Sequence, residues 1–300
     1  MLNTSPIFIN AFARGGSNIL MNLLMSHPNV CVSNGETHKV FKGTKWDPLW
    51  RKIKKRVMYD FPIRLLSGQD VFGGEYLKPR KPLPKYLQSY VDHILYYGRF
   101  TTMIDTHNRF KFENVPYTKE ELAKCRLLTK SLNGTVLAVD IFNTMYPDAV
   151  FFGLVRNGLA ICEGYTRRGI AAEEAGRVYK IVVDKMLEAN KNMNNYFLLK
   201  YEDMVSNPLE FMQQVYECAN LDLTQVKKAR LQSKKIMSAS GTRDRLKGGD
   251  RQVFWYDLSS LQEHIKPNIN ENQIHQLKTE DKKAFLSIAG DSMEACGYVI

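Results

Sequence analysis

The segment ARGGSN, from Ala13 to Asn18, combines residue types that can hold an anion. Its two glycines let the backbone approach a ligand closely, and the free N–H groups and positive dipole end of a following helix attract negative charge. Arg14 adds a permanent positive charge, while Ser17 and Asn18 add neutral donors. We therefore interpret the segment as a binding loop for phosphate or sulfate. An ordinary tight turn between a strand and a helix is the alternative.

The loop differs from two common nucleotide-binding motifs. A Walker A loop has a lysine directly after its last glycine, whereas Ser17 follows Gly16 here. The dinucleotide fingerprint G-x-G-x-x-G does not occur in the chain. These differences disfavour a P-loop kinase and a dinucleotide-dependent enzyme.

The elements that would position this loop follow from the alternation of strand and helix patterns. Apolar, β-branched segments recur between helical patterns at Ile7–Ala11, Val30–Val32, Leu127–Thr129, Val150–Val155 and Tyr196–Lys200. Such alternation predicts an α/β fold with a P-loop-like parallel β-sheet and helices on both faces. Ligands of these sheets bind outside the carboxyl ends of the strands. The loops after Ala11, Thr129 and Val155 are therefore where we expect the chemistry.

Several helix boundaries are also marked. Ile19, Leu20, Leu23 and Leu24 share one helix face before His27-Pro28 ends the pattern. Further helices are predicted from a capping box at Thr118 and Glu121, from the periodicity of 173–190, and from the proline that starts a helix after Ser206-Asn207.

Composition narrows the class of protein. The chain of 300 residues with 44% hydrophobic content can bury one large core, and no repeat or low-complexity linker divides it. The five cysteines are scattered without a CxxC pair and no HExxH motif occurs, so neither a disulfide framework nor a zinc site is indicated. No signal peptide or long apolar run is visible, which predicts a cytoplasmic protein without an integral membrane segment.

The formal net charge of +11 attracts anions without saying which kind. Between Lys39 and Arg56 stand eight Lys or Arg and a single acid, Asp47. In the same region Trp46, Leu49, Trp50, Ile53 and Val57 recur at helical spacing. We expect a helix that packs its apolar face on the core and leaves its basic face in water. A role at a membrane surface or toward an acidic acceptor is the alternative.

Three blocks of the sequence resemble the sulfotransferases that use 3′-phosphoadenosine 5′-phosphosulfate (PAPS). ARGGSNILMNLLMSHPNVCVSNGET is similar to their 5′-phosphosulfate loop, most closely to that of protein-tyrosine sulfotransferases. LLTKSLNGTVLAVDIFNTMYPDAVFFGLVRNGLAICEGYTRRG resembles their lysine strand and 3′-phosphate motif, and FLLKYEDMVSNPLEFMQQVYECANL resembles the Y-E-D-L-V segment. The blocks keep the family's order from Ile7 to Leu221.

The resemblance implies a single sulfotransferase domain over residues 1–300. Residues 42–115 and 224–300 match little and are expected to hold acceptor-binding or lid segments. PAPS would be the co-substrate, no metal would be needed, and the acceptor would be a hydroxyl of a small molecule, carbohydrate or peptide, with no nucleic acid involved. A catalytically inactive nucleotide-binding relative and a small P-loop kinase are the alternatives.

The resemblance also assigns roles to single residues. Lys130 matches the family lysine that neutralises the leaving phosphate or sulfate, and Arg156 matches the arginine that grips the 3′-phosphate, a task suited to a guanidinium fork. The 5′-phosphosulfate would be held by Arg14, Gly15, Gly16, Ser17, Asn18 and Ile19.

The acceptor hydroxyl needs a base within hydrogen-bond reach, and a glutamate with an ordinary pKa of about 4.3 is ionised at neutral pH. Glu36 is the candidate because Gly35-Glu36-Thr37 resembles the E-E-T segment of protein-tyrosine sulfotransferases. His107 is the rival, since cytosolic sulfotransferases use a histidine, although neither the lysine nor the proline of their K-T-H-x-P segment is present here.

Two positions near the expected 3′-phosphate site depart from the family pattern. The family usually has a serine eight residues after the arginine, where this chain has Gly164; the Gly164 amide or a neighbour such as Arg167 would have to replace that contact. Toward the C-terminus, Arg245 and Lys247 lie in a basic, glycine-containing loop that loosely resembles the R-K-G segment closing over the 3′-phosphate.

Overall fold

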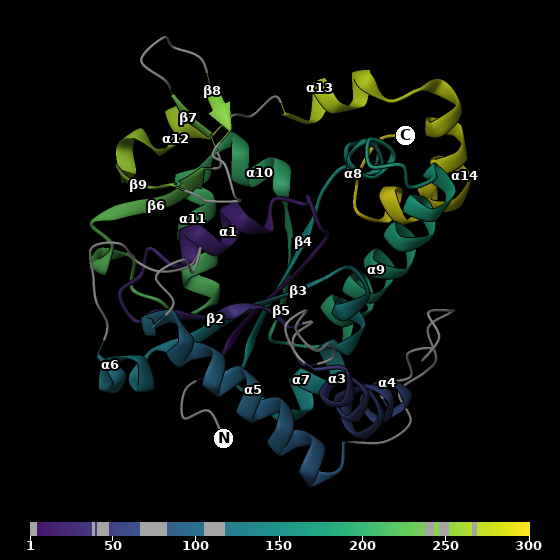
Figure 1. The fold of residues 1–300 in the computed structure, drawn as a ribbon. Coiled ribbons are helices and arrows are strands. Elements are labelled where there is room, and N and C mark those ends of the chain that lie inside the picture. Colours follow the sequence, from purple (N-terminus) through teal and green to yellow (C-terminus); the bar gives the residue numbers. More distant parts are fainter. Residues whose placement is uncertain are drawn as a thin grey trace.

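The computed structural model describes residues 5–37, 40, 48–66, 83–104, 118–233, 235–237, 243–245, 252–265 and 269–300. At its centre lies a five-stranded parallel sheet with the strand order β2-β3-β1-β4-β5 (Figure 1). The strands are β1 (Ile7–Ala11), β2 (Val30–Glu36), β3 (Arg126–Leu132), β4 (Val150–Val155) and β5 (Tyr196–Lys200). The predicted parallel α/β fold is therefore confirmed, with β2 and β3 longer than the sequence indicated.

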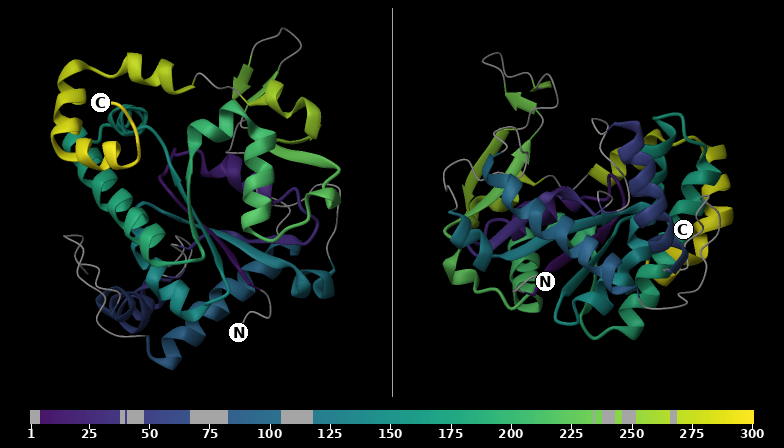
Figure 2. Two further views of the ribbon diagram at one scale, coloured as in Figure 1. Left: turned by 180° about the vertical axis from the view of Figure 1, so that it is seen from behind. Right: turned by 60° about the horizontal axis from the view of Figure 1, so that its bottom comes forward.

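Helices cover both faces of this sheet (Figure 2). One face carries α1 (Ser17–Leu24), α10 (Tyr201–Ser206), α11 (Pro208–Cys218) and α12 (Leu261–His264). The other carries α5 (Lys85–Ile104), α7 (Val139–Met145), α8 (Gly158–Thr166), α9 (Ala172–Asn192) and α14 (Thr279–Ala295).

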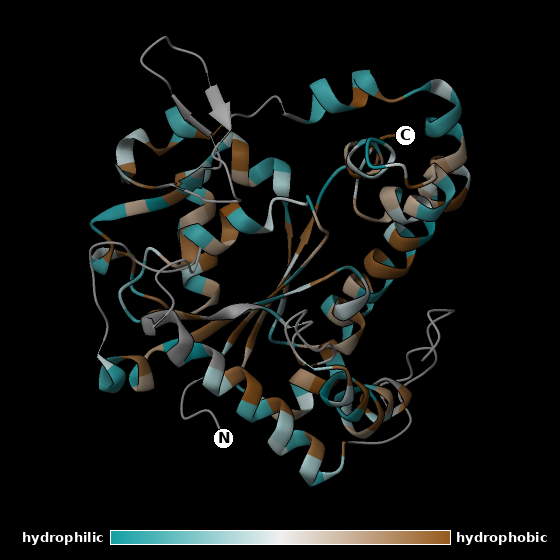
Figure 3. Ribbon diagram, viewed as in Figure 1, coloured by the Kyte–Doolittle hydropathy of each residue, from teal (hydrophilic) through white to brown (hydrophobic). Residues whose placement is uncertain are grey.

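Alternation along β1 divides the core in two. Ile7, Ile9 and Ala11 face α1 and α11, whereas Phe8 and Phe12 face α7 and α9, and all five are fully buried. Burial on both faces explains the nearly continuous apolar runs of the central strands, which Figure 3 colours brown.

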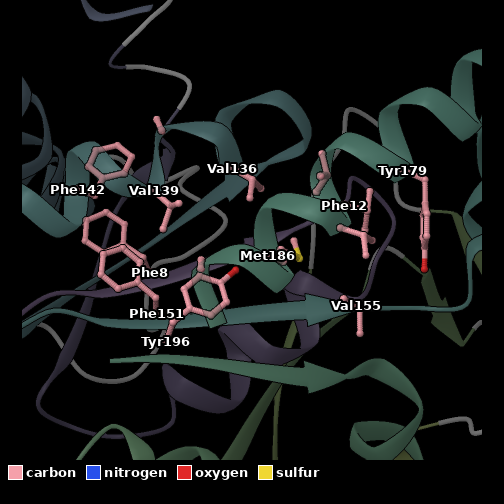
Figure 4. Packing of buried hydrophobic residues seen from close by; sticks show 14 of the residues in the cluster. Phe8, Phe12, Val136, Val139, Phe142, Phe151, Val155, Tyr179, Met186 and Tyr196 are labelled. Carbon is pink, nitrogen blue, oxygen red and sulfur yellow. The ribbon is translucent and has the colours of Figure 1, made fainter. Parts of the chain in front are cut away.

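An aromatic stack fills the α7 side of the core. The ring of Phe8 lies 4.8 Å from that of Phe142 and 5.0 Å from that of Phe151 (Figure 4). Offset aromatic pairs at such distances add to the free energy gained from burial alone. This packing holds β1 and β4 firmly, and the anion loop begins where β1 ends.

The predicted helix starts are confirmed. In α6 (Lys119–Lys124) the amide of Glu121 donates to Thr118 Oγ1 at 3.1 Å, and the amide of Thr118 donates to Glu121 Oε2 at 2.8 Å, which completes the capping box. In α11, Asn207 caps the helix and Pro208 occupies its first turn.

The remaining elements lie around this frame. They are α3 (Leu49–Lys55), the π-helical turn η1 (Arg56–Asp60), α4 (Phe61–Leu66), the 3-10 turns η2 (Asn133–Ala138), η3 (Leu223–Gln225) and η5 (Leu258–Ser260), the antiparallel pairs β6 (Lys228–Ser233) with β9 (Gln252–Asp257) and β7 (Lys235–Met237) with β8 (Arg243–Arg245), and α13 (Ile269–Gln276).

One expectation about these elements is wrong. The apolar side chains Leu49, Trp50, Ile53 and Val57 were expected to face the core, but each is more than half exposed. Trp46 lies outside the described residues. The helical periodicity was correct, whereas the direction in which the apolar face points was not.

Candidate active site

The anion loop turns sharply between β1 and α1. Arg14 and Gly16 both have left-handed backbone conformations, with φ of 77° and 87°. The amide of Gly15 donates to the carbonyl of Phe12 at 2.9 Å, which closes the turn. A Cβ on Gly16 would lie only 2.2 Å from Cδ2 of Tyr201, so this position requires glycine for space as well as for backbone conformation.

The turn leaves backbone donors available. In the parts of the chain that the structure describes, no protein acceptor receives the amides of Gly16, Ser17 or Asn18. These amides stand at the first turn of α1, where a helix has no partners of its own for N–H groups. The neighbouring amide of Ala13 is instead used structurally, because it donates to Asn133 Oδ1 at 2.9 Å. The loop therefore presents open donors to an anion.

Lys130 lies beside this row of amides. Its Nζ donates to Asn18 Oδ1 at 2.7 Å and lies 3.4 Å from Glu36 Oε1. The side chain is only 2% exposed, because β3 is flanked by β1 and β2. In the sheet register Lys130 stands opposite both Ile9 and Glu36. Three residues predicted separately from the sequence are thus brought together, and Lys130 is not an ordinary surface lysine.

Glu36 and Thr37 are held at the same edge of the sheet. The amide of Thr37 donates to the carbonyl of Lys130 at 2.9 Å, and the hydroxyls of Thr37 and Ser131 lie 2.8 Å apart. The register of β2 against β3 shifts between Val32 and Glu36, and this shift brings the Glu36 carboxylate opposite Lys130.

Arg156 follows β4 and lies at the other end of the anion loop. One of its terminal nitrogens donates to the carbonyl of Arg14 at 2.6 Å, and its guanidinium lies 4.4 Å from the centre of the Tyr201 ring. The side chain is 4% exposed. Burial lowers the pKa of Arg156, while the neighbouring Tyr201 and Glu202 act in the opposite direction.

Two residues of α13 complete the surroundings of Arg156. Its Nε donates to Asn270 Oδ1 at 2.8 Å, and a terminal nitrogen donates to Gln273 Oε1. Asn270 in turn donates to Glu202, and Gln273 Nε2 donates to Glu163 Oε2 at 2.7 Å. Sequence reasoning missed Asn270 and Gln273, since two amides on a polar helix form no motif.

The position that departs from the family pattern lies against the loop. A Cβ placed on Gly164 would lie 3.8 Å from Cβ of Arg14, which is ordinary van der Waals contact. Gly164 is therefore next to the predicted anion site. Arg167, considered as a substitute for the missing serine, is itself exposed and lies with Nε 3.3 Å from Oε1 of the buried Glu163.

The remaining predicted residues are His107, Arg245 and Lys247. His107 and Lys247 lie outside the described residues. The backbone of Arg245 belongs to β8, which pairs with β7.

Most of the chain is similar to known proteins. The family model described as "Sulfotransferase family" matches residues 6–225. A search of curated proteins found no match.

Two solved structures share the fold. The sulfotransferase domain from the Synechococcus PCC 7002 olefin synthase has 15% identity and a TM-score of 0.51, over 99% of this chain and 96% of that one. The sulfotransferase domain from the curacin biosynthetic pathway has 12% identity and a TM-score of 0.50, over 100% of both chains.

Proposed function

The chain belongs to the sulfotransferase family, and from that premise we propose how its site residues transfer a sulfuryl group from PAPS to a hydroxyl. The observation that carries the proposal is that one short loop connects two buried cations. Lys130 is bonded to Asn18 at one end of the loop, and Arg156 is bonded to the carbonyl of Arg14 at the other. A nucleotide with charged groups at its 5′ and 3′ positions can contact both.

The 5′-phosphosulfate would lie on the first turn of α1. The amides of Gly16, Ser17 and Asn18 would donate to its oxygens, and Arg14, Gly15 and Ile19 would complete the cradle. Lys130 would add a positive charge that water screens little, because its side chain is buried. Charge on the leaving 5′-phosphate would thus be neutralised as it develops.

The reaction would be a direct displacement at sulfur. The acceptor oxygen forms a bond to sulfur while the bond between sulfur and the bridging phosphate oxygen breaks, releasing adenosine 3′,5′-bisphosphate (PAP). The acceptor proton passes to the carboxylate of Glu36, which lies 3.4 Å from Lys130 Nζ and therefore next to the reacting group. Positioning and placed charge would carry most of the catalysis, as in phosphoryl transfer.

The 3′-phosphate would bind at Arg156. Each terminal nitrogen of a guanidinium carries two N–H groups, and the Arg14 carbonyl and Gln273 each use one of them. One N–H on each nitrogen is then left for phosphate oxygens. Because the side chain is 4% exposed, α13 has to move for the phosphate to reach it.

The acceptor is proposed only as a class, a hydroxyl on a small molecule, carbohydrate or peptide. The alternative of an inactive nucleotide-binding relative rests on Gly164 and predicts nucleotide binding without turnover. The kinase alternative has no support, because the matching family transfers sulfuryl groups.

Thermal-shift titration with PAP tests the proposal directly. At a hundredfold excess over Kd a ligand of the folded state should stabilise it by about 2.7 kcal/mol. We expect this shift for the natural chain and its loss in Arg14→Ala and Arg156→Ala, with Arg168→Ala, an exposed arginine, as the matched control. Transfer of label from PAPS to a panel of hydroxyl acceptors separates the enzyme from the inactive relative. No shift with the natural chain would refute the proposed site.

A further inference from the structure

The helical stretch formed by α3, η1 and α4 carries an apolar face that points into solvent. Leu49, Trp50, Ile53 and Val57 are 73%, 62%, 54% and 54% exposed. Their spacing places them on one side of a helix. We call these four residues the outer apolar face.

Basic residues occupy the rest of the same helical surface. Between Leu49 and Tyr59 the sequence contains no acid and five basic residues, which we call the basic flank: Arg51, Lys52, Lys54, Lys55 and Arg56. The guanidinium of Arg51 lies 5.5 Å from the centre of the Trp50 ring, so the two kinds of surface meet directly.

The second half of the stretch is anchored to the fold. The ring of Tyr59 stacks on that of Tyr90 in α5 at 3.8 Å, Ile63 is fully buried, and Asp60 is 6% exposed. The π-helical turn spans Arg56–Asp60, and within it Val57 faces solvent whereas Asp60 is buried. Figure 1 shows α3 and α4 at the lower edge of the molecule, close to α5. The outer apolar face is thus held outward by the packing of its neighbours.

We propose that this surface docks onto an anionic lipid bilayer. Exposed Trp, Leu, Ile and Val on one side and Lys and Arg on the other are the composition of helices that lie in the membrane interface. Long basic side chains beside the apolar face can reach lipid phosphates while their stems rest on apolar surface. In the described part of the chain no helix has the length and apolar character needed to cross a membrane, so the contact would be interfacial.

A second copy of the chain is a less suitable occupant. The central parts of protein interfaces are depleted in charged residues, and lysine is among the residues depleted most. Here Lys52, Lys54 and Lys55 stand between or beside the apolar positions. Charge complementarity therefore favours an anionic lipid surface, and the net charge of +11 acts in the same direction at longer range.

Co-sedimentation of the full chain with vesicles tests the proposal. Binding should be strong to vesicles of phosphatidylcholine with phosphatidylglycerol, weak to phosphatidylcholine alone, and weakened by added salt. Arg51→Gln with Lys54→Gln should lower the partition coefficient about thirtyfold, since each charge near an anionic surface contributes about a factor of five. Trp50→Ala with Ile53→Ala should lower it at least about tenfold.

The control variants distinguish binding by this surface from attraction by the positive charge of the whole chain. Lys119→Gln with Lys124→Gln removes two exposed charges from α6 and should leave most of the binding intact. All variants should keep the melting temperature, because the changed residues are exposed. The proposal is overturned if the chain does not bind anionic vesicles at low salt or if the α3 and α6 variants lose binding equally. It is also overturned if light scattering shows a dimer that Trp50→Ala with Ile53→Ala dissociates, which would make the surface a contact between copies.

Discussion

Arg156 donates a hydrogen bond to the carbonyl of Arg14 at 2.6 Å, which joins the end of β4 to the anion loop after β1. The two residues are far apart in sequence, but β1 and β4 are paired in parallel, so their carboxyl ends meet. The bond holds the Arg156 guanidinium at the Arg14 end of the anion loop, which leads into the open amides of α1. We therefore predict that a single nucleotide binds at both groups without any rearrangement of the sheet.

The amides of α13 should compete with the nucleotide for Arg156. Asn270→Ala with Gln273→Ala removes two acceptors that now bind the guanidinium. We expect the Kd for PAP, measured by calorimetry, to fall about tenfold. Hydrogen bonds to charged groups contribute about 1.5–3 kcal/mol, and in the variant the nucleotide would not have to break the bonds of Arg156 to these two amides. Asn272→Ala, an exposed residue of the same helix, is the control. Weaker binding by the double variant would instead mean that the two amides contact the nucleotide.

Glu36→Gln should separate binding from turnover. The amide cannot accept the acceptor proton as a carboxylate does, so we expect the turnover number to fall by about 10²–10⁴. The Kd for PAP should change little, because Glu36 lies on the acceptor side of Lys130 in the proposed arrangement. Glu217→Gln, an exposed glutamate of α11, should behave as the natural chain. Turnover that survives Glu36→Gln would make the assignment of the base wrong.

Gly164→Ser should restore a hydroxyl beside the anion site. The position accepts a Cβ with ordinary contacts to Arg14, so the substitution should not strain the fold. A new hydrogen bond to phosphate should lower the Kd for PAP by about threefold to tenfold. Gly164→Ala isolates the effect of the hydroxyl, because it adds only the Cβ. Equal affinities for the two variants would show that the 3′-phosphate does not reach this position.

The stability of the fold should depend on the protonation of His27. Burial lowers the pKa of this side chain from its ordinary value of 6.5, and its Nδ1 accepts a hydrogen bond from the amide of Asn29 at 3.1 Å, which requires the neutral ring. Above pH 6.5 the His27 ring is neutral in both the folded and the unfolded state, so it costs no stability. Below pH 6.5 the ring takes up a proton more readily in the unfolded state, so the free energy of unfolding falls as the pH decreases toward the lowered pKa of the folded state. His27→Asn keeps an acceptor for the amide and should flatten the decrease in melting temperature between about pH 7 and pH 5. An unchanged profile would assign the effect to other groups.

The sequence predicted the frame of the site well because β1 and β4 are buried on both faces and the edge strand β5 is itself an apolar run. Their apolar runs end where the strands end, so the bounds of all three were correct. The end of β2 was missed, since Ser33, Asn34 and Gly35 give no strand signal and the pairing of Glu36 with Lys130 depends on a shift in register. Only the resemblance to sulfotransferases therefore indicated that Lys130 and Glu36 belong to the same site.

Two features depended on tertiary packing that no local pattern encodes. An amphipathic helix shows its apolar side in the sequence but not whether that side meets the core, and α3 contains no buried residue. Asn270 and Gln273 are distant in sequence from Arg156, which they contact. Neutral amides are common on any exposed helix, so their presence in the sequence did not indicate this contact.

A crystal structure with bound PAP would show where each of the two phosphates of the nucleotide lies. We expect the 5′-phosphate on the amides of Gly16, Ser17 and Asn18 next to Lys130, and the 3′-phosphate on the guanidinium of Arg156 with α13 displaced. A bisphosphate that occupies another part of the molecule, or that leaves Arg156 bonded to Asn270 and Gln273 as it is now, would contradict this expectation.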